Sequence, residues 1–103
     1  MLVNLGSAQT AQAAVADSSQ GALLFEQHCA GCHIHGGNII RRGKNLKLKT
    51  LERDGIATVE AIAAIAREGR SQMSGYADVL GTDGDQLVAE WVLIQAQNAW
   101  TQG

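Results

Sequence analysis

Cys29-Ala30-Gly31-Cys32-His33 is the most informative segment of this 103-residue chain, and it contains both of its cysteines. Two cysteines at this spacing, followed by a histidine, fit three kinds of site. A redox-active disulfide needs a preceding strand in a βαβ unit, and no run rich in Val, Ile and Thr precedes Cys29. Structural zinc needs four ligands, and His28, His33 and His35 would supply the remaining ones at a spacing poorly suited to a tetrahedron.

The third kind of site is covalent attachment of a c-type haem, for which C-x-x-C-H is the signature. The two thiols would reach the two haem vinyl groups from adjacent helical turns, and the His33 imidazole would project toward the iron. We favour one haem c per chain, bound through Cys29 and Cys32. The disulfide and zinc sites remain as alternatives.

Met73 is the candidate for the second axial ligand of the iron. A histidine–methionine pair gives an electron carrier two strong-field ligands, and the thioether favours ferrous iron. Met73 follows His33 by forty residues, in a glycine-bracketed loop, whereas Met1 is terminal. We therefore predict ligation by His33 and Met73. The alternatives are a core-filling Met73 and a sixth ligand from His28 or His35, two residues that we expect on the surface.

The composition limits the class of protein. A mass of 10.9 kDa allows one domain. A net charge of −2 and 46% hydrophobic residues exclude a disordered chain and, by overall charge, a basic nucleic-acid-binding protein. No apolar run approaches the roughly 20 residues that span a bilayer. Four aromatic side chains make a thin core, which the haem is expected to fill.

Local patterns predict an all-α domain. Proline is absent, and alanine-rich stretches favour helix. We expect a helix from Gly21 to Cys29, a short helix ending at Gly55, and a helix over Val59–Glu68 that Thr58 caps and Gly69 ends. A loop over residues 70–75 and a last helix running toward Trp100, with its capping cluster at residues 82–85, complete the prediction.

Residues 1–16, MLVNLGSAQTAQAAVA, carry no charge and contain two A-x-A patterns. They resemble the tail of a secretory signal peptide, so we expect a signal-peptide remnant or a flexible tail, with the domain over residues 17–103. Export to a thylakoid lumen or periplasm agrees with haem attachment, which in c-type cytochromes follows translocation.

The ordered set of motifs resembles the cytochrome c6 family. The matching pieces are Ala16-Asp17, Gly21-x-x-x-Phe25-x-x-x-Cys29-Ala-Gly-Cys32-His33, Gly36-Gly37-Asn38, Lys44-Asn45-Leu46, Glu60-Ala61-Ile62, Gly69-x-x-x-Met73 and Gln95-Ala96-x-x-Ala99-Trp100. The resemblance implies a class I cytochrome c fold, with about four helices around one covalently bound haem. It also implies that Gly21 and Phe25 cross the last helix near Trp91, with the two rings edge to face.

Three departures resemble the c6B/c6C group of this family. Met73-Ser74-Gly75-Tyr76 stands where Met-Pro-Ala-Phe is usual, and Ile65 stands where a glutamine close to the haem is usual. Ile39-Ile40 leads into Arg41-Arg42, where the family usually has a proline near the carbonyl that orients the axial histidine. Beyond the motif and Met73, we predict cofactor contacts by Asn38, Lys44, Leu46, Leu51, Ile65 and Arg70.

The predicted function is that of a soluble, monomeric one-electron carrier, not an enzyme, in the photosynthetic or respiratory chain of a cyanobacterium-like organism. By resemblance, cytochrome f of cytochrome b6f is the donor, and photosystem I or a terminal oxidase is the acceptor. The alternative is a small haem enzyme or a gas or redox sensor with an open iron position. The basic run from Arg41 to Arg53 either steers docking on an acidic partner or is a solvated face.

Overall fold

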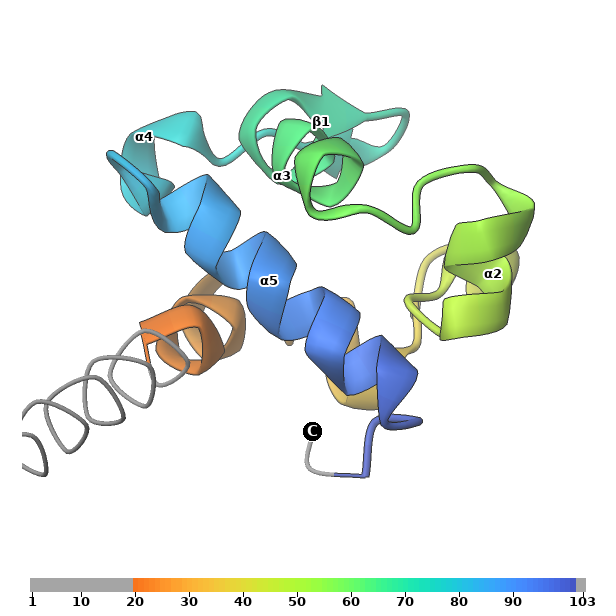
Figure 1. Cartoon of the computed structure of the whole chain (residues 1–103). Coiled ribbons are helices and arrows are strands. Elements are labelled where there is room, and N and C mark those ends of the chain that lie inside the picture. Colours follow the sequence, from red (N-terminus) through yellow and green to blue (C-terminus); the bar gives the residue numbers. More distant parts are fainter. Residues whose placement is uncertain (1–19, 102–103) are drawn as a thin grey trace, which may run out of the picture.

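The computed structural model describes residues 20–101, which form helices and one small hairpin (Figure 1). The chain is helical at residues 20–28 and then forms η1 (Ile34–Gly36), η2 (Arg42–Lys44), α2 (Leu48–Arg53), α3 (Val59–Glu68), β1 (Gly69–Arg70), β2 (Met73–Ser74), α4 (Ala77–Leu80) and α5 (Gly84–Gln97). This helical architecture confirms the predicted fold class. The tail predicted over residues 1–16 lies outside the described residues.

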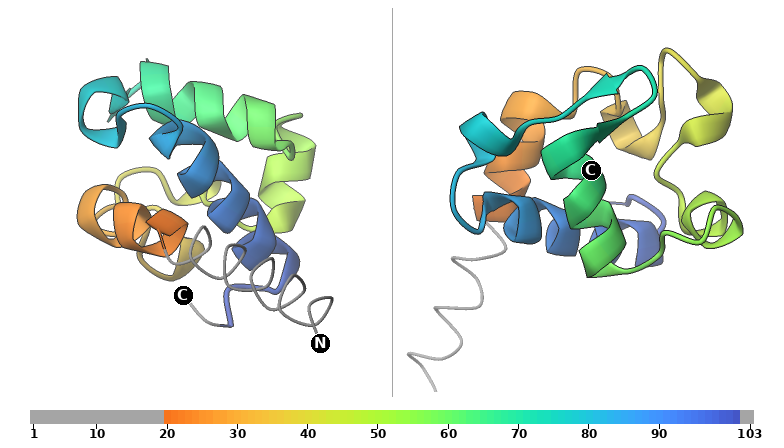
Figure 2. Two further views of the ribbon diagram at one scale, coloured as in Figure 1. Left: turned by 60° about the vertical axis from the view of Figure 1, so that its left-hand side comes forward. Right: turned by 90° about the horizontal axis from the view of Figure 1, so that it is seen from above.

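Helix α5 is the central element, with the helix at residues 20–28 on one side and α3 on the other (Figures 1 and 2). Gly21 allows the first crossing, because a Cβ there would lie 2.5 Å from the Leu87 carbonyl oxygen and 2.9 Å from the Trp91 Cβ. Phe25 meets Trp91 with ring centroids 4.9 Å apart, which confirms the predicted contact. The rings are tilted by 40° instead of edge to face, because Phe25 also packs on Trp100 at 5.5 Å.

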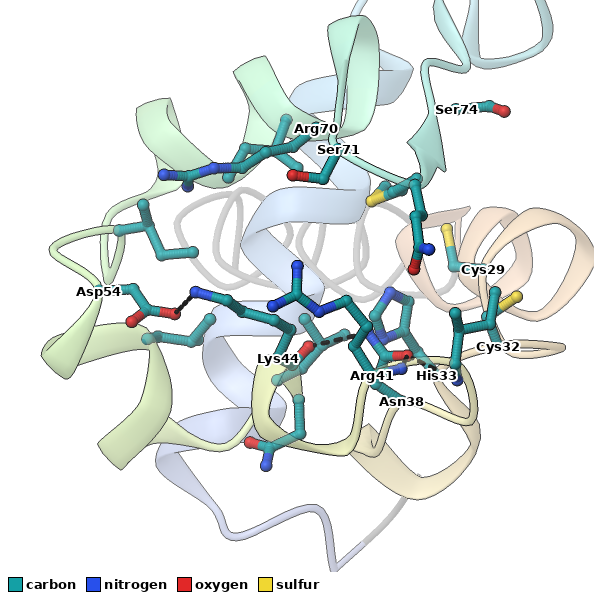
Figure 3. A pocket seen from close by; sticks show the side chains of 18 of the residues that line it. Cys29, Cys32, His33, Asn38, Arg41, Lys44, Asp54, Arg70, Ser71 and Ser74 are labelled. Atoms are coloured by element: carbon teal, nitrogen blue, oxygen red, sulfur yellow. Dashed lines mark hydrogen bonds and ion pairs between the residues drawn. The ribbon is translucent and has the colours of Figure 1, made fainter.

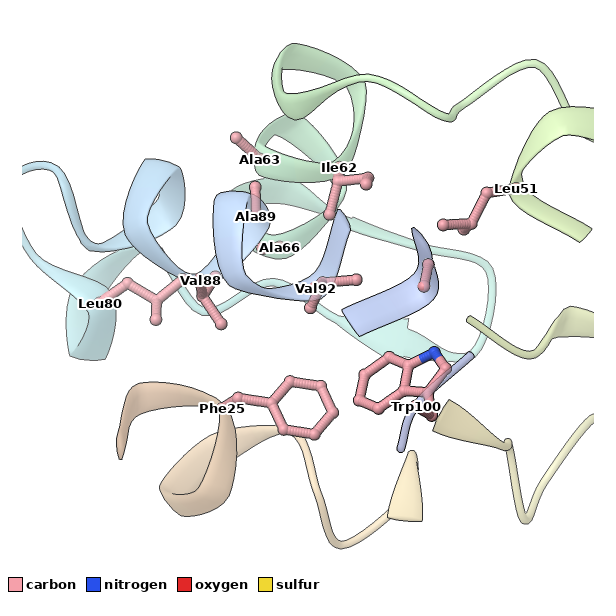
Figure 4. Packing of buried hydrophobic residues seen from close by; sticks show 11 residues of the cluster. Phe25, Leu51, Ile62, Ala63, Ala66, Leu80, Val88, Ala89, Val92 and Trp100 are labelled. Atoms are coloured by element: carbon pink, nitrogen blue, oxygen red, sulfur yellow. The ribbon is translucent and has the colours of Figure 1, made fainter. Parts of the chain in front are cut away.

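The hydrophobic core is built largely from small side chains (Figure 4). Its buried members are Phe25, Leu51, Ile62, Ala63, Ala66, Leu80, Val88, Ala89, Val92, Ala96 and Trp100. Among the described residues, Leu51 and Val88 are the largest side chains that are fully buried. A core of this kind leaves the centre of the molecule thinly filled by protein.

Helix α3 has the predicted bounds, Val59–Glu68. The Thr58 hydroxyl accepts a hydrogen bond from the Ala61 N–H at 3.1 Å, as an N-cap does. Gly69 ends the helix at φ +83°, in the region that glycine adopts without strain. The prediction of this helix from its apolar periodicity and its two end signals is confirmed.

The segment that carries Met73 differs from the predicted loop. Strands β1 and β2 form an antiparallel hairpin in which Arg70 pairs with Met73 and Gly69 pairs with Ser74. Gly75 then passes close to α3, since a Cβ there would lie 2.5 Å from the Arg67 carbonyl oxygen. The hairpin therefore fixes the position of Met73 relative to α3.

Helix α4 was not predicted, and α5 ends at Gln97 instead of running toward Trp100. The chain turns at Asn98, whose N–H donates to the carbonyls of Ile94 and Gln95. Ala99 and Trp100 have positive φ angles of 56° and 57°, which a right-handed helix cannot contain. None of the helices within residues 20–101 combines the length and apolar character that a membrane crossing requires.

Candidate functional site

The cysteine motif continues the helix at residues 20–28 by a further turn. The N–H of Cys29 donates to the Phe25 carbonyl at 2.8 Å, and the N–H of His33 donates to the Cys29 carbonyl at 3.0 Å. Cys29 is half-buried and Cys32 is exposed, and neither forms a disulfide. This local geometry places Cys29, Cys32 and His33 together in the lining of one pocket (Figure 3).

His33 is held in one orientation and one tautomer. Its ring is 8% exposed, and its Nδ1 lies 2.8 Å from the Gly37 carbonyl oxygen. A carbonyl only accepts, so Nδ1 must donate, which leaves the Nε2 lone pair available as a ligand. The tight turn that brings Gly37 back to His33 includes Gly36 at φ +77°, where a Cβ would lie 2.5 Å from the Trp100 ring.

A pocket of about 570 Å³ opens beside His33. Its walls come from the motif turn, the loop at residues 38–46, α2, α3 and the β1–β2 hairpin. Leu46, Leu51, Ile56 and Ile65 make it apolar, and Met73 reaches it from the hairpin. A volume of this size is typical of sites that enclose a small molecule or cofactor.

Charged and polar side chains gather at one end of the pocket. The Lys44 Nζ lies 3.4 Å from Asp54, and Arg53 donates to Asp54 at 3.0 Å. The hydrogen bond from Arg53, followed by the charges of Arg53 and Lys44, outweighs desolvation and lowers the pKa of Asp54. Figure 3 shows Asp54 and Lys44 on one side of the pocket and the two cysteines on the other.

The loop at residues 38–46 is fixed by contacts that connect distant parts of the chain. Asn38 donates to the Lys44 carbonyl at 3.0 Å and accepts from the N–H groups of Ile40 and Arg41 at 2.9 and 2.8 Å. The Trp100 indole N–H donates to the Leu46 carbonyl at 3.0 Å, across 54 positions of sequence. The end of the chain therefore holds one wall of the pocket in place.

Every residue predicted to contact the cofactor lines this one pocket. They are Cys29, Cys32, His33, Asn38, Lys44, Leu46, Leu51, Ile65, Arg70 and Met73. His28 was expected on the surface but also lines the pocket, where its ring centroid lies 6.2 Å from that of Tyr76. His35 is exposed and does not line the pocket.

Sequence reasoning named Arg41 only as one of three basic residues that could touch a haem carboxylate. It missed several other polar lining residues, namely Asn45, Asp54, Ser71, Gln72, Ser74 and Tyr76. Asp54 directly follows the short helix α2, and no sequence pattern predicted that its side chain would face the pocket. Gln72 immediately precedes Met73, so its place in the pocket follows from the hairpin that the sequence did not reveal. The His33–Gly37 hydrogen bond was also missed.

The two alternatives for the cysteine motif find no support in the structure. No group of three His, Cys, Asp or Glu side chains within residues 20–101 could hold a metal ion. Burial, followed by repulsion from Cys32, raises the pKa of Cys29 to about 11, so this thiol would be almost wholly protonated near neutral pH. A disulfide oxidoreductase needs the thiolate.

The pocket fits a covalently attached haem by the chemistry of its donors. It offers two sulfur atoms at one end, an imidazole with a free Nε2, and a thioether from a separate element. Apolar walls surround these groups, and cations suited to haem carboxylates lie away from the cysteines. A cavity of about 570 Å³ also has room for a large cofactor.

Comparisons with known proteins agree with this fit. A family model described as "Cytochrome C oxidase, cbb3-type, subunit III" matches residues 16–92. A cytochrome c6-like protein of Nostoc sp. (strain PCC 7120) is 48% identical over 94 residues, which cover 91% of this chain and 85% of the relative.

Two solved structures of Synechococcus proteins are also similar. Cytochrome c6B from strain WH8102 is 73% identical with a TM-score of 0.79, and the match covers 82% of this chain and 96% of the other. Cytochrome c6C from strain PCC 7002 is 51% identical with a TM-score of 0.74, over 77% of this chain and 96% of the other. These similarities confirm the resemblance predicted from the sequence, including that to the c6B/c6C group.

Proposed function

The chain belongs to the cytochrome c6 family, and from this membership we propose that it carries single electrons between redox proteins through an iron bound by His33 and Met73. As a member, it has one c-type haem attached through Cys29 and Cys32 of its C-x-x-C-H motif. The haem supplies an iron that changes between the ferric and ferrous states. The chain supplies the attachment, the axial ligands and the surroundings.

The observation that carries the proposal is that His33 and Met73 come from separate elements to one pocket. The hydrogen bond from His33 Nδ1 to Gly37 keeps Nε2 unprotonated and aimed, so binding iron needs no change of tautomer. Met73 is half-buried in a hairpin anchored to α3, which favours a ligand that stays in place in both redox states. A fixed coordination sphere suits electron transfer.

The pocket walls keep water from the iron. Leu46, Leu51 and Ile65 are half-buried or buried and line the pocket from three different segments. A dry, apolar environment disfavours the additional positive charge of ferric iron and so raises the reduction potential. Cys32 is exposed, so the attachment side is the side from which a redox partner would approach.

For location and partners we propose export to a thylakoid lumen or periplasm. The uncharged segment at residues 1–16 supports this proposal, as does a chloroplastic cytochrome c6 among the relatives. Cytochrome f of cytochrome b6f as donor, and photosystem I or a terminal oxidase as acceptor, are the partners that the family suggests. A side pathway is the other role that fits the resemblance to the c6B/c6C group.

A small haem enzyme or gas sensor would instead need an open iron position and a distal acid–base group. The test is the spectrum of the purified protein. A carrier with the proposed ligands shows a sulfur-to-ferric-iron band near the red end of the spectrum, no high-spin signal, and no binding of carbon monoxide. A high-spin ferric form that binds carbon monoxide when reduced would overturn the proposal.

A further inference from the structure

Arg41 occupies an unusual position among the basic residues of this chain. The Asn38 side chain accepts from the N–H groups of Ile40 and Arg41, which folds the loop so that Arg41 follows a tight turn. Figure 3 shows the Arg41 side chain reaching into the pocket between His33 and Lys44. Arg41 and its neighbour Arg42 are both exposed, but Arg42 does not line the pocket.

The other cations near this wall are already engaged or lie elsewhere. Lys44 is paired with Asp54 at 3.4 Å, and Arg53 donates both to Asp54 and to the Gly43 carbonyl. Arg70 lies on the opposite wall, along the hairpin (Figure 3). The Arg41 guanidinium makes no hydrogen bond or ion pair with the described residues, so its N–H donors are available. Arg41 also lines the pocket, so these donors can reach a bound group.

The attachment chemistry fixes which part of the haem faces this wall. In a haem, the two vinyl groups that form the thioether bonds lie on the edge opposite the two carboxylate groups. Cys29 and Cys32 lie on one side of the pocket, and Arg41 and Lys44 lie farther from them (Figure 3). A guanidinium matches a carboxylate with two parallel hydrogen bonds, which an ammonium cannot do.

We propose that Arg41 binds a haem carboxylate and thereby raises the reduction potential of the iron. Lys44 forms an ion pair with Asp54, which offsets part of its positive charge. Lys44 therefore neutralises the haem carboxylates less than an unpaired lysine at the same position would. A carboxylate that Arg41 neutralises stabilises ferric iron less than a free carboxylate does. The inference deepens the proposed function but does not depend on Met73 being the sixth ligand.

The experiment is a redox titration of the holoprotein with three variants: Arg41→Gln, Arg41→Lys and Arg42→Gln. Arg42→Gln removes the same charge from the adjacent position and is the matched control. Each variant is titrated at low and high ionic strength, and its ferric absorption spectrum is recorded to verify the iron ligands. Wild-type protein is measured under the same conditions.

We expect Arg41→Gln to lower the equilibrium constant for reduction about tenfold, which is 59 mV for one electron. The effect should persist at high salt, because a guanidinium in direct contact with a carboxylate is screened less than a charge that lies far from the haem. Arg41→Lys should recover only part of the loss, because lysine keeps the positive charge but not the two parallel hydrogen bonds. Arg42→Gln should change the constant less than about twofold at low salt, and less again at high salt.

Equal effects of Arg41→Gln and Arg42→Gln that both vanish at high salt would overturn the inference, as would an Arg41→Lys variant that loses as much as Arg41→Gln. A potential change accompanied by a new ferric spectrum would show that Arg41 acts on iron ligation instead, which also contradicts it. If the wild-type spectrum itself lacks the sulfur–iron band, the proposed ligation fails, but the comparison of Arg41 with Arg42 still decides this inference.

Discussion

Ile65 lines the pocket at a position where the family usually has a glutamine. It lies on α3, eight residues before Met73, and is half-buried in the pocket wall. Where the family usually has a glutamine amide, this chain has a hydrocarbon. Two effects on the reduction potential of the iron compete. Isoleucine raises the potential by excluding water, and glutamine raises it by directing the positive hydrogens of its amide toward the haem.

We predict that Ile65→Gln raises the reduction potential by about 40 mV. One differential hydrogen bond is worth about 1 kcal/mol, and 1.4 kcal/mol corresponds to 59 mV for one electron. The two side chains are similar in volume, so the wall should stay dry and the amide dipole should decide the outcome. A redox titration of both forms at one pH and ionic strength measures the shift.

The matched control for this substitution is Ile94→Gln, on a residue that is 44% exposed and does not line the pocket. Its potential should equal that of the wild type. A fall in the potential of Ile65→Gln, or no shift relative to Ile94→Gln, would mean that desolvation outweighs the dipole or that Ile65 does not face the haem.

At the residue scale, the sequence was informative where the chemistry depends on local spacing. The C-x-x-C-H motif pointed to Cys29, Cys32 and His33, and the glycine-bracketed segment pointed to Met73; all four line one pocket. Asp54 was not predicted, and Arg41 could not be distinguished from Arg42, because an ion pair and a loop turn place these side chains. A run of charged residues does not itself show which side chains face inward. Asn38 was expected to contact the cofactor, and the structure shows most of its hydrogen-bonding capacity used within its own loop.

At the scale of elements, helix α3 was predictable because it carries an apolar stripe, a threonine cap and a terminal glycine within its own sequence. The β1–β2 hairpin was not, since its strands have two residues each and are too short for an alternating pattern. Helix α4 has four residues, and its N-cap position, Tyr76, provides no side-chain hydrogen bond. Short elements that depend on tertiary contacts leave no periodicity in the sequence.

The crossing of α5 with the helix at residues 20–28 depends on Gly21. We predict that Gly21→Ala lowers the free energy of unfolding by about 1–3 kcal/mol, the usual cost of overpacking a tight contact. The added methyl would lie 2.5 Å from the Leu87 carbonyl oxygen, which is backbone and cannot rotate away. Denaturant unfolding of the holoprotein measures the change.

Gly43→Ala serves as the control for this prediction, because a Cβ at Gly43 would meet nothing within 4 Å. The substitution keeps the backbone carbonyl of residue 43, which accepts a hydrogen bond from Arg53. If Gly21→Ala is as stable as Gly43→Ala, the two helices do not cross as closely as described.

For the whole molecule, the small core and the large pocket beside it lead us to expect that folding depends on the cofactor. Most of the buried core side chains are small, and a pocket of about 570 Å³ adjoins them. A group that binds only the folded state stabilises that state by its binding free energy. We predict that a Cys29→Ala, Cys32→Ala chain made without haem loses most of its helical circular dichroism, measured against the holoprotein. Native helicity in that chain would contradict the prediction.

The charges are also unevenly distributed over the molecule. Arg42, Lys47 and Lys49 are exposed near one wall of the pocket, outside the pocket lining. If they steer association, replacing all three with glutamine should slow electron transfer to an acidic redox protein about tenfold at low ionic strength. The difference should disappear at high ionic strength, where exposed charges are screened. Stopped-flow rates with the same salt dependence in both forms would identify these residues as an ordinary solvated face.

We propose that His33 and Met73 bind the iron of an electron carrier, and the ferric absorption spectrum of Met73→Ala shows whether Met73 is a ligand. The variant should retain its covalent haem, because Cys29 and Cys32 are unchanged. It should lose the sulfur-to-iron band near the red end of the spectrum and become high-spin or water-ligated. A Met73→Ala spectrum identical to that of the wild type would show that Met73 is not the ligand and would contradict the account.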